Sequence, residues 1–168
     1  MKNIALVGFM GTGKSVVARR ISRALKMRYL NTDDIIEARE KRPISEIFAK
    51  DGEPYFRAIE REVVKEASST ENAVIAAGGG VVLSEENMSN LRKKGVIVCL
   101  NASAEDVYER TKSYAHRPLL NVPDPLAKIK ELMDKREPYY RKADHQVETS
   151  GKSLDKIVDE IIAIAERA

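Results

Sequence analysis

The sequence predicts an α/β fold, a three-layer α/β/α arrangement around a five-stranded parallel sheet. Short apolar runs alternate with segments whose apolar residues recur at helical spacing, which is typical of parallel strands joined by crossover helices. The candidate strands are residues 3–7, 28–31, 73–77, 96–100 and 145–149. The 168 residues, 43% of them hydrophobic, are enough for a single domain over 1–168 with a real hydrophobic core.

Apolar stripes mark the helices between these strands. After the first strand, Val17, Ile21 and Leu25 share one helical face, and residues 154–165 repeat the pattern behind a Ser153 N-cap. These stripes predict core packing and carry no chemistry of their own.

Two segments interrupt the alternation of strands and helices. Residues 33–61 form a charged insertion of short helices after the second strand, and residues 112–123 lack strong periodicity, as a mobile loop would. Both follow elements that would bring them to the carboxyl ends of the strands, where open α/β sheets bind ligands. We therefore predict an acceptor-binding insertion at 33–61 and a lid at 112–123.

Composition argues against several classes of function. The 29 Lys and Arg against 26 Asp and Glu give a net charge of +3, too small to indicate nucleic-acid binding, and the lack of Trp argues against base stacking. No apolar run approaches membrane-spanning length, and no signal peptide is recognisable. Cys99 is the only cysteine and lies in an apolar run, which indicates a buried side chain and a reducing, cytoplasmic location. We expect a monomer without nucleic-acid or membrane partners.

Residues 8–15, Gly-Phe-Met-Gly-Thr-Gly-Lys-Ser, match G-x-x-x-x-G-K-[ST] directly after an apolar run. The glycines let backbone N–H groups form a concave nest for anions. Lys14 can reach the β- and γ-phosphates, the Ser15 hydroxyl can ligate Mg²⁺, and the following helix points its partly positive N-terminus at the same anion. A glycine-rich turn is the alternative, but all four fixed positions match in context. The loop predicts nucleoside triphosphate binding.

Asp33 and Arg57 are candidates for binding the phosphoryl acceptor. Asp33 follows the second strand by two residues, so at the sheet edge it could orient an acceptor hydroxyl and take its proton, or it could equally be an N-cap or first-turn acid. The Arg57 guanidinium suits a carboxylate, although composition alone favours a surface pair with Glu60. Both interpretations of Arg57 can hold, because Glu60 can support the guanidinium.

Gly78, Gly79 and Gly80 end the third predicted strand. Three consecutive glycines weaken an element, so we interpret them as allowing backbone N–H groups to approach a ligand closely, with a tight turn as the alternative.

Three further arginines are weaker candidates, and two of them have two interpretations each. Arg117 lies in the predicted lid, where it could stabilise charge on a transferring phosphoryl group or remain solvated. Arg136 ends a helix predicted over 125–136, so it could bind a ligand or interact with the helix dipole. Arg110 is more easily explained as a structural residue. The two histidines, His116 and His145, have no metal-ligand spacing.

Together these motifs resemble the shikimate kinase family over nearly the whole chain. Besides the phosphate loop, the matching segments are, in order, residues 32–37, 44–48, 51–53, Phe56-Arg57-x-x-Glu60, 78–80, Arg117-Pro118-Leu119-Leu120 and Arg136-x-x-x-Tyr140. The phosphate loop alone occurs in very many proteins, whereas its combination with F-R-x-x-E, G-G-G and R-P-L-L is highly specific.

The resemblance implies a kinase that uses ATP and Mg²⁺ to phosphorylate the 3-hydroxyl of shikimate, with a fold like that of nucleoside monophosphate kinases. It implies that Lys14, Asp33 and Arg117 are catalytic and that Ser15 binds the metal. Shikimate would be held by Asp33, Arg57, Gly78, Gly79, Gly80 and Arg136. ATP would be held by Gly11, Thr12, Gly13, Lys14, Ser15, Val16, Arg110, Arg117 and Lys152.

The chain departs from the family pattern at one position near the metal. The family commonly reads D-T-D, with the first acid implicated near Mg²⁺, and here that position is Asn31. An amide keeps an acceptor oxygen but lacks the negative charge, so we expect Mg²⁺ to be held with less electrostatic help.

Two other functions remain as alternatives. Another small-molecule kinase, such as a gluconate or nucleoside monophosphate kinase, would share the architecture, but Arg57, Arg136 and the three glycines favour a small carboxylate acceptor. A nucleotide-dependent switch protein would be expected to carry a guanine-recognition signature such as N-K-x-D, which the sequence lacks.

Overall fold

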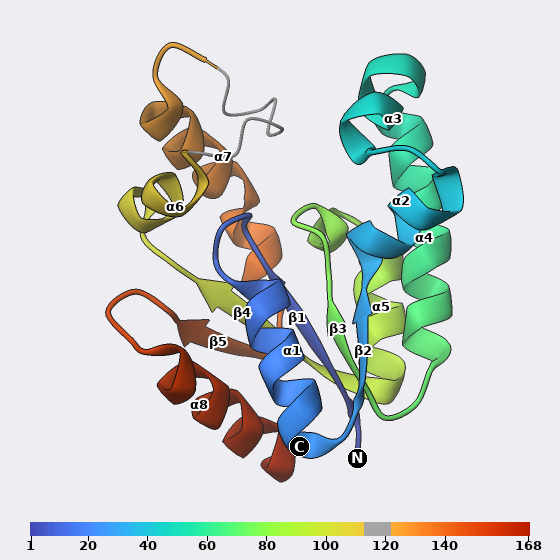
Figure 1. The fold of residues 1–168 in the computed structure, drawn as a ribbon, viewed down its shortest axis with the longest axis vertical. Helices are drawn as coiled ribbons and strands as arrows, with labels where there is room; N and C mark the ends of the chain where they lie inside the picture. Colours follow the sequence, from blue (N-terminus) through green and yellow to red (C-terminus); the bar gives the residue numbers. More distant parts are fainter. Residues whose placement is uncertain (113–121) are drawn as a thin grey trace.

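Five parallel strands form the centre of the molecule (Figure 1), which confirms the predicted fold class. The computed structural model describes residues 1–112 and 122–168. The strands are β1 (Asn3–Gly8), β2 (Arg28–Asn31), β3 (Ala73–Ala76), β4 (Gly95–Asn101) and β5 (His145–Glu148). They are hydrogen-bonded in the order β2-β3-β1-β4-β5, and every neighbouring pair is parallel.

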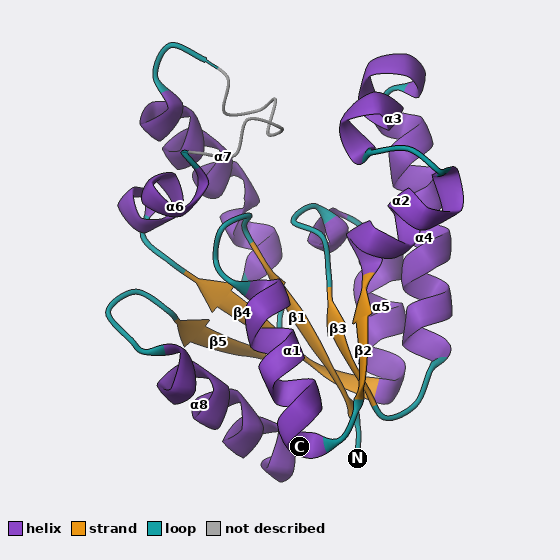
Figure 2. Cartoon of the chain, viewed as in Figure 1, coloured by secondary structure: helices purple, strands orange, loops and turns teal. Residues whose placement is uncertain are grey.

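Helices cover both faces of this sheet, which gives the three predicted layers (Figure 2). Successive side chains of β1 point to opposite faces. Ile4 and Leu6 pack in the core beneath α1 (Lys14–Leu25) and α8 (Leu154–Arg167), and Ala5 and Val7 pack in the core on the other face. The helices of that second face are α5 (Glu85–Lys94), α6 (Ala104–Thr111), α7 (Pro125–Tyr140) and part of α4 (Glu53–Ser69).

The predicted insertion has a small core of its own. It comprises α2 (Thr32–Glu40), α3 (Ile44–Asp51) and the first half of α4, packed around Ile36, Ile47 and Phe56. The prediction of short helices is right for α2 and α3 and wrong for α4, which has 17 residues. Its apolar stripe continues from the insertion core into the main core at Val64 and Ala67, so nothing ends the helix earlier.

The helix predicted over 125–136 continues to Tyr140 with Pro138 inside it. The proline removes one backbone hydrogen bond, but burial of Tyr140 in the main core stabilises the last turn. Arg136 is therefore one turn away from the helix end, which weakens the interpretation that it compensates the helix dipole.

Two groups of helices extend beyond the carboxyl edge of the sheet (Figure 1). The helices α2, α3 and α4 stand on one side of the loop between β1 and α1, and α6 and α7 stand on the other side. Within the described ranges, every helix is too short or too polar to cross a membrane. Most of the predicted lid, including Arg117, lies outside the described residues.

Candidate active site

The phosphate loop connects β1 to α1 at the carboxyl edge of the sheet. Gly8 and Gly11 have φ values of 142° and 76°, and a Cβ on Gly8 would lie 2.5 Å from the Leu100 carbonyl oxygen, so both positions require glycine. The Lys14 Nζ donates to the carbonyl oxygens of Gly8 at 2.6 Å and Phe9 at 3.0 Å. Helix α1 begins at Lys14, directly after the loop, so its N-terminus faces the loop. This is the arrangement that binds phosphates.

Asn31 presents a nitrogen to the Ser15 hydroxyl. Its Nδ2 donates to the Oγ of Ser15 at 3.0 Å and to the Tyr29 hydroxyl at 3.2 Å. Its Oδ1 caps α2 by accepting from the backbone N–H of Asp34 at 3.0 Å. The cap sets the orientation of the amide, so the oxygen that we expected near the metal is used by the helix.

The other residues predicted to bind nucleotide are placed differently from one another. The Arg110 Nη1 donates to the Gly11 carbonyl at 3.0 Å, so this arginine lies against the loop. Thr12 is buried and donates to the Phe9 carbonyl, within the loop. Lys152 forms an ion pair with Glu160 on α8 at 2.9 Å. The remaining predicted residues are Gly13, which precedes α1, half-exposed Val16, and Arg117, which is outside the described residues.

Each of the three glycines after β3 lies next to a polar side chain from a different helix, and a Cβ at Gly78 or Gly80 would clash with that side chain. A Cβ at Gly78 would lie 2.5 Å from the Oδ1 of Asp33, which comes from α2. A Cβ at Gly80 would overlap the guanidinium of Arg57, from α4. The nearest atom to a Cβ at Gly79 is the Nη1 of Arg136, from α7, at 3.5 Å. The turn therefore gathers the predicted acceptor residues around it.

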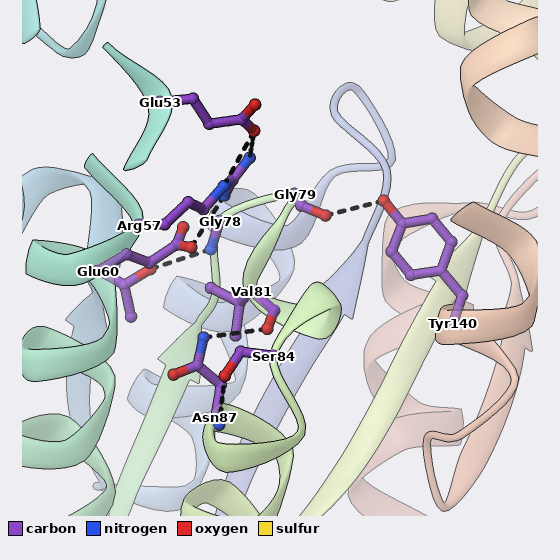
Figure 3. Close-up of polar contacts among 10 residues, drawn as sticks. Glu53, Arg57, Glu60, Gly78, Gly79, Val81, Ser84, Asn87 and Tyr140 are labelled. Carbon is purple, nitrogen blue, oxygen red and sulfur yellow. Dashed lines mark hydrogen bonds and ion pairs between the residues drawn. The ribbon is translucent and has the colours of Figure 1, made fainter. Parts of the chain in front are cut away.

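Two carboxylates hold Arg57 beside this turn (Figure 3). Its Nη1 donates to Glu60 at 2.9 Å, and its Nε and Nη2 donate to Glu53 at 3.3 and 3.2 Å. Glu53 is exposed, whereas Glu60 is 1% exposed. Burial raises the pKa of Glu60, and the positive charge of Arg57 opposes this shift. The predicted pair with Glu60 is present, but Glu60 is buried and not on a solvated helix face, and the pair holds the guanidinium at the site.

Electrostatics also connect the other acceptor candidates. The charge of Asp33 raises the pKa of Glu60 and that of Arg136 lowers it, so both lie within range of the buried carboxylate. The Arg136 guanidinium also lies 5.9 Å from the centre of the Phe9 ring, in the phosphate loop. A cavity of about 190 Å³ lies between the phosphate loop and the glycine turn. It is lined by loop residues together with Asn31, Asp33, Gly78 and Gly79.

Two buried hydroxyls at this turn had no assigned role in the sequence. The Tyr140 hydroxyl donates to the Gly79 carbonyl at 2.9 Å (Figure 3), and the Thr32 Oγ1 accepts from the Gly78 N–H at 2.9 Å. Burial raises the pKa of Tyr140 to about 12, so the phenol stays protonated near neutral pH. Both residues belong to motifs noted in the sequence. The residues around them do not indicate that their hydroxyls contact a turn so far away along the chain.

Full-length comparisons point to one family. The family model described as shikimate kinase matches residues 10–166. A shikimate kinase from Thermodesulfovibrio yellowstonii is 47% identical over 99% of this chain and 96% of its own length. One from Caldanaerobacter subterraneus is 44% identical over 96% of this chain and 95% of its own length.

Solved structures agree with the sequence relatives. The shikimate kinase from Acinetobacter baumannii in complex with shikimate has a TM-score of 0.94 and 34% identity, covering 99% of this chain and 94% of its own. That from Aquifex aeolicus has a TM-score of 0.84 and 39% identity, covering 98% and 96%. A gluconokinase from Sinorhizobium meliloti, with a TM-score of 0.62 and 21% identity over 99% and 94%, shares the fold alone. The chain belongs to the shikimate kinase family.

Proposed function

We propose that the glycine turn and the phosphate loop together carry out the transfer of the γ-phosphoryl group of ATP to the 3-hydroxyl of shikimate. The observation that carries this proposal is the convergence of Asp33, Arg57 and Arg136 on residues 78–80, beside a loop of the nucleotide-binding type. A hydroxylated carboxylic acid needs both a cationic group for its carboxylate and an acceptor for its hydroxyl proton. This turn gathers both.

The two arginines provide the carboxylate site. Guanidinium groups donate paired hydrogen bonds that match the geometry of a carboxylate. Arg57 is held by the buried Glu60, and the exposed Glu53 can leave it when a substrate carboxylate arrives. The known complex of the Acinetobacter baumannii shikimate kinase with shikimate supports an acceptor of this kind.

Asp33 acts on the reacting hydroxyl. It lies between the phosphate loop and the glycine turn, where its carboxylate orients the hydroxyl for in-line attack and accepts its proton. Lys14 offsets charge on the phosphates, as does the Arg117 predicted from the sequence. When bound, Mg²⁺ supplies further charge compensation, and the Ser15 hydroxyl is the protein oxygen that would hold it. That hydroxyl, at the N-terminus of α1 beside the loop, fits a metal held mainly by phosphates.

In this proposal the insertion at 33–61 binds the acceptor, since it carries Asp33 and Arg57. The lid at 112–123 and the cytoplasmic location remain predictions from the sequence. We also propose a monomer, because one chain supplies all the residues named here.

An assay of ADP release with several acceptors tests the function. We expect release that depends on shikimate and on Mg²⁺, and none above background with gluconate or with nucleoside monophosphates. Asp33→Asn should abolish shikimate-dependent release while leaving ATP binding, measured by calorimetry, nearly intact. Release driven by gluconate or a nucleotide, or near-normal turnover of Asp33→Asn, would overturn the proposal.

A further inference from the structure

The glycine turn has to keep a constant position relative to helices that reach it from two sides. Asp33 approaches it from α2 and Arg136 approaches it from α7, and these helices lie far apart in the chain. A shift of either helix relative to the turn would separate the groups that bind one small substrate. Small displacements of this kind have large effects on reactive geometry.

Tyr140 connects the turn to α7. Its hydroxyl donates to the Gly79 carbonyl at 2.9 Å, and its side chain is 7% exposed. Tyr140 follows Arg136 by four residues, so the two side chains lie on the same face of the helix. The positive charge of the Arg136 guanidinium acts on the phenol by lowering its pKa, against the larger effect of burial. The phenol thus ties the glycine turn to the helix that carries Arg136.

Thr32 makes the equivalent connection to α2. It is fully buried, it accepts the Gly78 N–H at 2.9 Å, and it directly precedes Asp33 in the chain. Adjacent residues of the turn are therefore held from opposite sides by buried hydroxyl groups. A buried polar group that loses its partner costs more than the bond itself contributes, so each contact strongly favours one position of the turn.

We propose that Tyr140 is a positioning residue that holds the glycine turn and Arg136 at the spacing required by the carboxylate of the acceptor, with Thr32 holding the opposite side of the turn beside Asp33. This inference deepens the proposed function and depends on it. We expect the two hydroxyls to affect acceptor binding and to leave nucleotide binding unchanged.

The substitution Tyr140→Phe tests the proposal because it removes one oxygen and keeps the buried ring. We expect the KM for shikimate and its calorimetric Kd to rise about threefold to tenfold, the range for one lost hydrogen bond. The KM for ATP and kcat should stay within about twofold of wild type. Tyr139→Phe is the matched control, since Tyr139 is adjacent, 38% exposed, and faces Lys142; it should change none of these values.

A neutral substrate analogue separates positioning from a general structural role. The wild-type enzyme should prefer shikimate over methyl shikimate, which lacks the negative charge, and Tyr140→Phe should reduce this preference. A loss of kcat or of ATP affinity in Tyr140→Phe with an unchanged KM for shikimate would overturn the proposal. So would an equal loss of affinity for both acceptors.

Substitutions of Thr32 provide an independent test of the proposal. Thr32→Val removes the hydroxyl while keeping the shape of the side chain, and it should raise the KM for shikimate. Thr32→Ser keeps a hydroxyl and should keep this KM near the wild-type value. If Thr32→Ser and Thr32→Val behave alike, the hydroxyl has no positioning role. These outcomes are distinct from failure of the proposed function, in which the wild-type enzyme itself would release no ADP with shikimate.

Discussion

Asn31 offers an N–H group to the hydroxyl that would ligate Mg²⁺. Because its oxygen caps α2, the amide cannot turn round without leaving the Asp34 N–H unpaired. An aspartate at this position would cap the helix equally well and would add a negative charge beside Ser15. The two residues therefore differ in the charge beside Ser15 and in the Nδ2 bonds to Ser15 and Tyr29, which an aspartate cannot donate.

For Asn31→Asp we predict a Mg²⁺ requirement about threefold to tenfold lower, as one added charge a few ångströms from the metal would give in a solvated site. A Mg²⁺ titration of the ADP complex by calorimetry, repeated by activity, measures it. Asn72→Asp adds the same charge before β3, at the amino end of the sheet, and should leave the requirement unchanged. An unaltered requirement in Asn31→Asp would contradict this account.

Glu60 gives a pH dependence whose sign follows from its burial. Its pKa is raised above the usual 4.5, so its contribution to the free energy of unfolding is fully present below that value. The contribution declines as the pH rises through the higher pKa of the folded state. The unfolding free energy of wild type minus that of Glu60→Gln should therefore fall as the pH rises above the usual pKa of 4.5, as followed by urea denaturation.

Glu62→Gln is the control for this experiment. Glu62 lies on the same helix with its side chain 71% exposed, so its substitution should give a nearly flat difference. A Glu60 difference that rises with pH would show that the pair with Arg57 outweighs burial.

At the scale of elements, α2, α3 and the first half of α4 place Asp33 and Arg57 through their own small core. Ile47 is fully buried in that core, and Ile161 is fully buried in the core beneath α8. We predict that either Ile→Ala substitution lowers the unfolding free energy by about 2–5 kcal/mol. Only Ile47→Ala should also weaken shikimate binding in calorimetry, by about threefold or more. Equal effects of both substitutions on shikimate binding would rule out a positioning role for this core.

The elements themselves could largely be read from the sequence. All five strands lie within one residue of the predicted ends, because apolar runs of this length bounded by turns have few other interpretations. The predicted end of α7 at residue 136 is wrong, because burial of Tyr140 in the main core favours one more turn. Helix ends depend on tertiary packing in this way, which local patterns do not record.

At the scale of the whole molecule, strand order explains why the two halves of the site meet. β1 pairs directly with β3, so the phosphate loop after β1 and the glycine turn after β3 leave the sheet side by side. The sequence predicts that both lie at the carboxyl edge, but it does not specify their order. The contact between Tyr140 and Gly79 spans 61 residues, and the orientation of Asn31 depends on a cap. Neither could be predicted without the assembled fold.

We propose that the glycine turn makes room for the side chains that would bind the acceptor. Gly80 is a good test position because its φ of −99° suits any residue and the three atoms nearest to an added Cβ all belong to the Arg57 guanidinium. Gly79→Ala is the matched control, since its Cβ would find ordinary contact distances.

Calorimetric titration of shikimate into Gly80→Ala, Gly79→Ala and wild type is the most direct measurement. We predict that Gly80→Ala weakens shikimate binding about tenfold or more, as the loss of a charge-assisted hydrogen bond would, while ATP affinity is unchanged and Gly79→Ala stays closer to wild type. Wild-type affinity for shikimate in Gly80→Ala would contradict the account.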